Sequence, residues 1–341
     1  MIVSFLEYEG IQYFSLHAEQ VISSTYFESN IGIYTSELFA DALIRIETHI
    51  SRCEPATTVL DFERIESAVP NLNKILGEIA KKSVQLILTN VKKLVFEKLD
   101  IALVGENPYN EKDADGTGYK KFYFDKNSDS IMVADEEERF NYNFADILSK
   151  YTIESNQGYH SSSSVYLSKY IDIKKLISVE QRIFTYALYW LAIKIQVNWN
   201  IRSNANGEVT PPTLVCQNLN SSYMASILST FLRLDVLILD HLGPINTMYS
   251  SLSQRIVRDK EYIIVSDVVC LGTEVKIAKT LINFLGGKVF GNVSMVKLDT
   301  LKEEHSLVEQ RRLPSISVFN INAANNSTIG FHIKTALDLN E

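Results

Sequence analysis

The sequence predicts an α/β protein with a smaller N-terminal α/β domain and a C-terminal domain built on a parallel sheet. Three observations lead to this prediction. Apolar, β-branched runs such as Tyr262–Val265 are typical of strands buried on both faces. Segments with apolar residues at helical spacing separate these runs, and alternating strands and helices form parallel sheets. The length of 341 residues is sufficient for two domains.

Composition and charge limit the protein classes to consider. Hydrophobic residues make up 46% of the chain, but no run of about 18 apolar residues occurs, so we expect no membrane span. The first ten residues lack the positive region of a signal peptide. Cys53, Cys216 and Cys270 are too widely separated to form a metal cluster, which fits a reducing cytoplasm. The net charge of −8 gives no indication of nucleic-acid binding.

The N-terminal domain, residues 1–105, begins with a hairpin pattern from Val3 to Leu16 around Glu9-Gly10. The segments predicted after it are a helix at Glu37–Ser51 capped by Ser36, a strand at Thr57–Phe62, a helix at Pro70–Lys81 and a strand at Val84–Thr89. With Asp61 ending a buried strand, this order resembles the STAS (sulfate transporter and anti-sigma-antagonist) class of interaction domains. That resemblance implies a protein partner for this module. A generic α/β packing domain is the alternative.

Residues 106–158 predict an irregular connector, because turn-forming and charged residues dominate its first part. Within it, Lys121–Phe124 and Ser130–Val133 are expected to pair as a hairpin. The charged run Glu136–Arg139 is interpreted as solvated. Among the cysteines, Cys53 is expected to be a partly buried packing residue, and Cys216 to lie in an apolar strand.

The C-terminal domain, residues 159–341, contains the most informative stretch, from Tyr262 to Lys297. A strand is followed by the loop Asp267–Thr273, a helix at Val275–Leu285 and a second strand at Val289–Val296. Consecutive strands joined by a helix are parallel, and ligands bind outside the carboxyl ends of such strands. The loop amides, with Gly272 allowing close approach and the helix N-terminus adding positive potential, can hold a phosphate.

This loop resembles the phosphoribosyl-diphosphate (PRPP) loop of type I phosphoribosyltransferases, particularly those of orotate. The resemblance implies that Asp267 binds the ribose hydroxyls and the metal, and that Gly272 and Thr273, with Cys270 in the same loop, bind the 5′-phosphate. Ser266, however, stands in place of the first acid of the motif, and Cys270 and Leu271 replace small hydroxyl-type residues. Glu274 adds a negative charge, and a carboxylate near a phosphate repels it by about 1–3 kcal/mol.

Three further segments follow the same family order. The serine run Ser161–Ser164, including Ser162 and Ser163, precedes Tyr170-Ile171-Asp172 and a long helix at Ser178–Ile195, and resembles the base-binding hood; a Ser-rich linker is the alternative. The turn Asn218–Ser222 stands where the family binds pyrophosphate, with Ser221 and Ser222 as donors or, alternatively, as helix caps. The segment Asp240–Pro244 and the polar stretch Ile245–Asp259 after it stand where the catalytic flap lies. Its cationic candidates are His241, Arg255 and Arg258, with solvated loop charges as the alternative.

Two functions remain open. The resemblance implies a divergent phosphoribosyltransferase that uses or binds PRPP or a nucleotide with Mg²⁺, and that forms a homo-oligomer. Its catalysis would rest on positioning and charge stabilisation around Asp267, Arg255 and Arg258. The alternative is a protein that keeps the scaffold without turnover, as a regulatory, interaction or bacterial conflict-system effector protein, because fold alone does not decide function.

Overall fold

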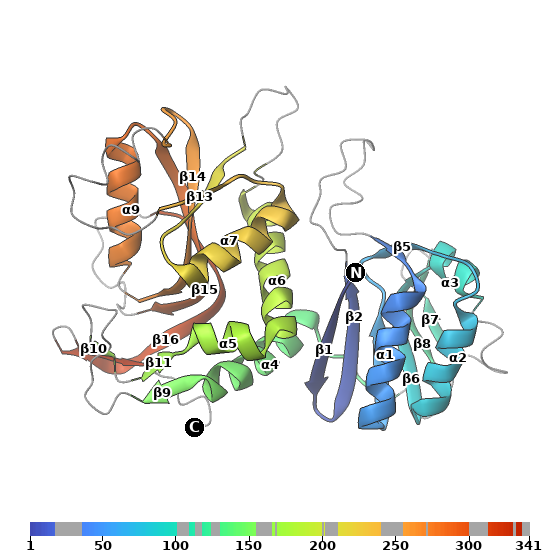
Figure 1. Cartoon of the computed structure of the whole chain (residues 1–341). Coiled ribbons are helices and arrows are strands. Elements are labelled where there is room, and N and C mark those ends of the chain that lie inside the picture. Colours follow the sequence, from blue (N-terminus) through green and yellow to red (C-terminus); the bar gives the residue numbers. More distant parts are fainter. Residues whose placement is uncertain are drawn as a thin grey trace. The chain divides into compact units, whose positions relative to one another are not determined.

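The computed structural model describes residues 1–17, 36–100, 109–112, 118–123, 130–154, 166–167, 169–199, 201, 211–239, 255–270, 272–299, 313–329 and 332–335. The chain forms two compact units, residues 1–144 (unit 1) and 145–341 (unit 2), and each contains its own sheet (Figure 1). The change from unit 1 to unit 2 falls inside helix α4 (Glu136–Lys150). The predicted boundaries at residues 105 and 158 lie outside the described residues.

Unit 1 is a mixed sheet with the strand order β1-β2-β4-β6-β8-β7. Strands β2, β4 and β6 are parallel to one another, whereas β1, β8 and β7 are antiparallel to their neighbours. Its elements are β1 (Ile2–Tyr8), β2 (Ile11–His17), β3 (Ser36–Leu38), α1 (Ala40–Cys53), β4 (Thr57–Asp61), β5 (Ile65–Ala68), α2 (Asn73–Lys82), β6 (Gln85–Lys92), α3 (Lys93–Leu99), β7 (Tyr109–Lys112) and β8 (Gly118–Tyr123).

The two faces of this sheet are covered differently. Helices α1, α2 and α3 bury one face in an apolar core that includes Leu43, Leu76 and Val95. The first half of α4 covers the other face, where Arg139 lies over the ring of Tyr13 at 4.4 Å from its centroid. The predicted hairpin is confirmed, with Glu9 and Gly10 both at positive φ. The resemblance to the STAS class stays a prediction.

Four local predictions for unit 1 are wrong. Ser36 starts β3, and Phe39 is the N-cap of α1. β8 pairs with β7 and β6, and residues 131–135 form no strand, because β7 supplies the antiparallel partner instead. The run at Glu136–Arg139 opens α4 and is only partly solvated, since Glu137 and Glu138 are exposed but Glu136 is 9% exposed and Arg139 1%. Cys53 is exposed at the end of α1.

Unit 2 confirms the predicted parallel sheet, because β13, β12, β14, β15 and β16 are neighbours in that order and all parallel. Its elements after α4 are β9 (Thr152–Glu154), β10 (Tyr166–Leu167), β11 (Lys169–Ile171), α5 (Ile173–Val179), α6 (Gln181–Trp199), β12 (Thr213–Cys216), α7 (Leu219–Leu232), β13 (Val236–Ile238), β14 (Glu261–Val269), α9 (Thr273–Phe284), β15 (Lys288–Asp299), β16 (Ser315–Ile329) and β17 (His332–Thr335). The single long helix predicted from Ser178 is instead α5 and α6, separated at Glu180.

The order of strands in unit 2 reverses between β12 and β14. The chain passes from β12 outward to β13, and β14 then lies on the opposite side of β12. In open parallel sheets, ligands bind outside the carboxyl ends of the strands at such a reversal. Figure 1 shows α9 on one side of this sheet and α6 with α7 on the other. The buried side chains of Ala278 and Ile282 pack α9 against Ile264 of β14.

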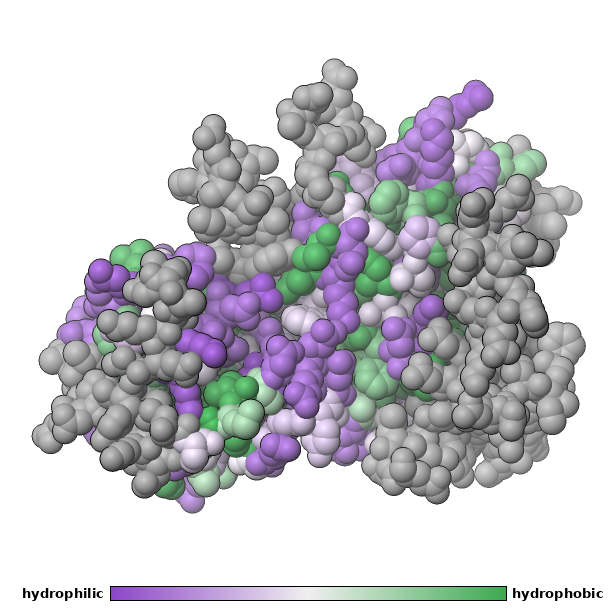
Figure 2. Space-filling view, turned by 180° about the vertical axis from the view of Figure 1, so that it is seen from behind, coloured by the Kyte–Doolittle hydropathy of each residue, from purple (hydrophilic) through white to green (hydrophobic). Residues whose placement is uncertain are grey.

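The surface in Figure 2 mixes polar and apolar residues, as most protein surfaces do. Across the described parts of the chain, no helix combines the length and the hydropathy that crossing a membrane requires.

Candidate functional site

Asp267 lies near the carboxyl end of β14, where the strand order reverses. Its carboxylate is held by groups from two segments of the chain. Asn220 Nδ2 donates to Asp267 Oδ2 at 2.8 Å, and Asn218 Nδ2 approaches Oδ1 at 3.5 Å. The backbone N–H of Val268 also donates to Oδ1, at 3.0 Å. The N-terminal end of α7 and the last residues of β14 therefore meet at one carboxylate, and β14 continues through Val269, past the predicted start of the loop at Asp267.

The turn Asn218–Ser222 is organised mainly as a helix cap. Asn218 Oδ1 accepts from the N–H of Ser221 at 2.8 Å, and Ser221 Oγ accepts from the N–H of Asn218 at 3.1 Å, which together form a capping box. Ser222 Oγ donates to the carbonyl of Asn218 at 2.8 Å. Ser221 is 1% exposed. The predicted capping role holds for Ser221, and Ser222 bonds to the carbonyl four residues earlier, while the Nδ2 amides of Asn218 and Asn220 are directed at Asp267.

The loop after β14 ends in an uncapped helix N-terminus. Gly272 is the N-cap of α9 with φ of 67°, a left-handed conformation that favours glycine, and no side chain caps the helix. Thr273 is exposed at the first helical position. The first N–H groups of a helix have no partner within the helix and can receive an anion. Leu271 lies outside the described residues.

The charges around this helix end oppose an anion, however. Burial, followed by the negative charges of Asp267 and Glu274, raises the pKa of Cys270 to about 12. Burial and Asp267 likewise raise the pKa of Glu274, the acidic residue in the first turn of α9. Burial is the larger cause of both shifts, and the negative charge of Asp267 contributes to each. The helix amides would attract a phosphate at this position, and the carboxylates of Asp267 and Glu274 would repel it.

Ser266 takes no part in this loop. Its side chain is 9% exposed, and its Oγ accepts from Asn292 Nδ2 at 3.1 Å. Asn292 is itself buried and also donates to the carbonyl of Ile264 at 3.0 Å. Successive side chains of a strand point to opposite faces, so Ser266 points to the face opposite to that of Asp267.

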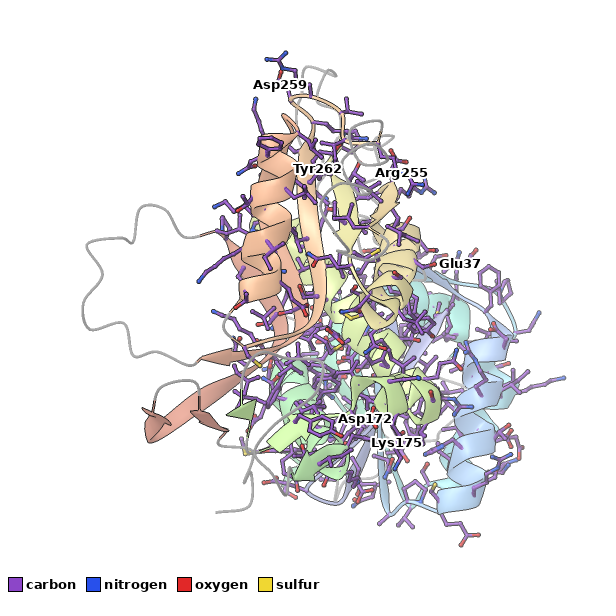
Figure 3. All side chains as sticks on the ribbon, turned by 60° about the vertical axis from the view of Figure 1, so that its left-hand side comes forward. Glu37, Asp172, Lys175, Arg255, Asp259 and Tyr262 are labelled. Atoms are coloured by element: carbon purple, nitrogen blue, oxygen red, sulfur yellow. The ribbon has the colours of Figure 1, made fainter. Side chains whose placement is uncertain are left out.

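The structure does not bring Arg255 and Arg258 together with Asp267. Both precede β14 and are exposed at its amino end, where the N–H of Asp259 donates to the carbonyl of Gly286 at 2.8 Å (Figure 3). Six residue steps of β14, at about 3.3 Å each, put roughly 20 Å between Glu261 and Asp267. The alternative interpretation, that these arginines are solvated, agrees with this placement.

Several predicted site residues lie outside the described residues: Ser161–Ser164, with Ser162 and Ser163, and His241. Of the hood-like segment, Tyr170 lies in β11 and Asp172 caps α5, accepting from the N–H of Lys175 at 2.9 Å. Asp172 thus has a structural role in helix capping.

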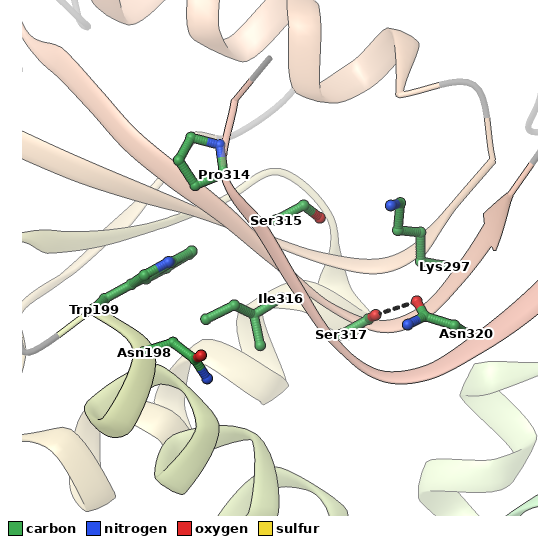
Figure 4. A pocket seen from close by; sticks show the side chains of 8 residues that line it. All are labelled: Asn198, Trp199, Lys297, Pro314, Ser315, Ile316, Ser317 and Asn320. Atoms are coloured by element: carbon green, nitrogen blue, oxygen red, sulfur yellow. Dashed lines mark hydrogen bonds between the residues drawn. The ribbon is translucent and has the colours of Figure 1, made fainter. Parts of the chain in front are cut away.

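Sequence analysis missed two features. Asn220 gives no signal by residue type, because only the pairing of β12 with β14 brings it to Asp267. The second is a cavity of about 550 Å³ where the end of α6 meets β15 and β16, with Trp199, Lys297 and Asn320 in its lining (Figure 4). A Cβ on Gly291 would lie 2.5 Å from Cη2 of Trp199, so glycine permits this position of the indole. None of the described residues predicted for the site lines this cavity.

The described residues do not offer Mg²⁺ a site of their own. Among them, no group of three or more histidine, cysteine, aspartate or glutamate side chains could hold a metal ion. The partners of Asp267 are N–H donors rather than the oxygen ligands that Mg²⁺ requires. The predicted role of Asp267 as a metal ligand therefore depends on oxygens that a ligand would bring.

Neither the models of known protein families nor the curated proteins match this chain. Among solved structures, orotate phosphoribosyltransferase from Aeropyrum pernix is 16% identical, covers 52% of this chain and 93% of its own, and has a TM-score of 0.36. The orotate phosphoribosyltransferase from Mycobacterium tuberculosis in complex with PRPP is 14% identical, and the match covers 53% of this chain and 96% of that enzyme, with a TM-score of 0.35. Adenine phosphoribosyltransferase from Rhodothermus marinus is 15% identical, and the match covers 53% of this chain and 100% of that enzyme, with a TM-score of 0.37.

Likenesses this distant say nothing about the ligand or reaction of this chain. The α/β class and the parallel sheet of unit 2 rest on its own strand order and register.

Proposed function

We propose that unit 2 is a phosphoribosyltransferase-like domain that binds PRPP or a related ribose nucleotide at the carboxyl ends of β12 and β14. One observation carries this proposal: Asp267, the turn Asn218–Ser222 and the uncapped Gly272 end of α9 gather where the strand order reverses. A carboxylate accepts hydrogen bonds from ribose hydroxyls, and open helix amides donate hydrogen bonds to phosphate oxygens. The ribose and the phosphate of such a ligand would then each have a binding partner in the site.

In the enzymatic form of this proposal, the bond from the ribose anomeric carbon to pyrophosphate breaks as a bond to a base nitrogen forms. Pyrophosphate leaves with the electron pair of the broken bond. Positive charge develops on the ribose, and positioning with charge stabilisation lowers the barrier without a covalent intermediate. Asp267 would orient the ribose, and the amides around Gly272 and Thr273 would hold the 5′-phosphate. Mg²⁺, held by oxygens of the ligand, would neutralise pyrophosphate.

Isothermal calorimetry with PRPP, with and without Mg²⁺, tests the binding. We expect micromolar, Mg²⁺-dependent binding that Asp267→Asn abolishes. The matched control is Asp259→Asn, near the amino end of β14. Asp259 has a φ of 63°, which asparagine tolerates. Its Oδ1 lies 3.0 Å from Lys288 Nζ, so the control also removes a carboxylate charge. That variant should bind as the unmodified protein does. No binding up to millimolar PRPP would contradict the proposal.

A second candidate function is binding without turnover. Ser266 favours it, because the position of the first acid in the resembled motif holds a buried hydroxyl that is bonded to Asn292. Glu274 adds a charge that opposes phosphate. On this view the domain senses a nucleotide or serves as a scaffold in regulation, interaction or bacterial conflict.

Pyrophosphate release distinguishes the two candidates. The protein is incubated with PRPP, Mg²⁺ and a panel of purine and pyrimidine bases, and pyrophosphate is measured. Turnover that Asp267→Asn removes supports the enzyme, and binding without release with any base supports the sensor. Glu274→Thr should increase PRPP affinity, because it removes a charge that opposes phosphate, whereas Ser266 points to the other face of the strand and is left unchanged.

A further inference from the structure

Asn220 is the strongest partner of the Asp267 carboxylate. Its Nδ2 donates to Oδ2 at 2.8 Å, while Oδ1 is held by the Val268 N–H at 3.0 Å. Asn220 is half-buried at the second position of α7. Asn218 is less free to move, because its Oδ1 is fixed by the Ser221 N–H and its amide lies 3.5 Å from Asp267. The hydrogen bond to Asp267 is the only one found for the Asn220 side chain among the described residues.

A ligand hydroxyl that binds Oδ2 of Asp267 shares that acceptor with the Asn220 amide. An ionised carboxylate only accepts hydrogen bonds, and a ribose diol binds it through both oxygens. Hydrogen bonds to a charged group are among the stronger ones in proteins, so displacing Asn220 has a free-energy cost. Rotating the Asn220 side chain away would open Oδ2 and leave the capping box of α7 intact.

We propose that Asn220 is a positioning residue that competes with ribose hydroxyls for Asp267 and so sets the affinity of the site. This inference rests on the proposed function. Asn220 holds the carboxylate in place while the site is empty and rotates away when a diol binds. Ligands without a free vicinal diol do not displace it.

Calorimetric titration of PRPP tests the inference in Asn220→Ala and Asn220→Leu, with Asp267→Asn present or absent. Removing the amide should increase PRPP affinity about tenfold, the gain expected when one competing hydrogen bond to a charged group is lost. In the Asp267→Asn background neither Asn220 substitution should restore detectable binding, because the competition acts through that carboxylate. Asn220→Leu keeps the side-chain volume and guards against a packing defect in the alanine variant. The matched control is Ser226→Ala, an exposed position on the same helix.

The possible outcomes distinguish the role of Asn220 from the proposed binding of PRPP. Tighter binding by both Asn220 variants, dependent on Asp267, supports the competition. If the unmodified protein binds PRPP and the variants bind equally or more weakly, the inference is overturned and the proposed function stands. If only the Asn220 variants bind, the competition is supported and the proposed function of the unmodified protein is overturned. If none of the proteins binds, the proposed function fails and the inference falls with it.

Discussion

At the scale of single residues, the site depends on where a strand puts its polar side chains. Asp267 could be predicted, because an acid after an apolar run lies at a sheet edge, and the structure confirms that position. Asn220 could not be predicted, because its role follows from the pairing of two strands that are distant in sequence. Arg255 and Arg258 are predicted from their charge and their place in the flap segment of the resembled family, and the structure leaves them exposed ahead of β14, away from Asp267.

The thiol of Cys270 provides a residue-scale test of the negative charge in the site. Its pKa is raised to about 12 by burial, Asp267 and Glu274, so at pH 8 only about one part in ten thousand is thiolate. Iodoacetamide should therefore label exposed Cys53 at least a thousandfold faster than Cys270, as measured by mass spectrometry of the peptides. Glu274→Gln should speed the labelling of Cys270, because it removes one cause of the raised pKa.

The control for that labelling is Glu261→Gln, at the amino end of β14, which should leave the rate at Cys270 unchanged. An unchanged labelling rate of Cys270 in Glu274→Gln would contradict the charge distribution described here.

At the scale of elements, helix α4 is the main feature that sequence analysis missed. Most strands and helices were predicted within a few residues, because apolar runs and helical spacing report burial directly. The start of α4 carries four charged residues and was interpreted as solvated, yet Arg139 is buried against Asp61 with Nη2 3.3 Å from Oδ2. Only tertiary pairing makes such a charge stable in a core.

Replacing Arg139 with methionine tests that pairing. Asp61 would keep Asn90 Nδ2 at 2.9 Å and the Glu63 N–H at 3.1 Å, but it would lose its cation in a buried setting. We expect the free energy of unfolding to fall by about 3 kcal/mol, measured by urea denaturation followed by circular dichroism. Adding Asp61→Asn should restore part of the loss, because the unpaired charge is then gone.

The matched control on the same helix is Lys150→Ala. It breaks an exposed pair with Asp146, whose Oδ2 lies 2.5 Å from Lys150 Nζ, and should cost no more than about 0.5 kcal/mol. A similar decrease in the free energy of unfolding in both variants would contradict the larger stabilisation expected from the Arg139–Asp61 pair.

At the scale of the whole molecule, the chain is two folded units whose division falls within one helix. Unit 1 includes β7, β8 and the first half of α4, segments that composition alone assigned to an irregular connector. Turn-forming residues between short strands obscure such elements, because each strand has too few residues for its periodicity to be recognised.

Two fragments test the organisation of unit 1. Residues 1–150 should fold alone and unfold cooperatively, because they contain the whole of α4. Residues 1–135 lack Arg139, Phe140 and Phe144, which are buried in the full chain, and should lose cooperative unfolding. For both fragments, thermal melts measure the cooperativity of unfolding, and the dispersion of amide signals in NMR spectra reports whether the fragment is folded. Equal stability of the two fragments would show that α4 is not part of the unit.

The central claim is that a ribose phosphate binds at the carboxyl ends of β12 and β14. The most direct measurement is a crystal structure of the unmodified protein with PRPP and Mg²⁺. We predict ligand density with the ribose at Asp267 and the 5′-phosphate at the amides of Gly272 and Thr273. Density confined to the cavity beside Trp199 and Lys297, or an empty site at millimolar PRPP, would contradict the claim.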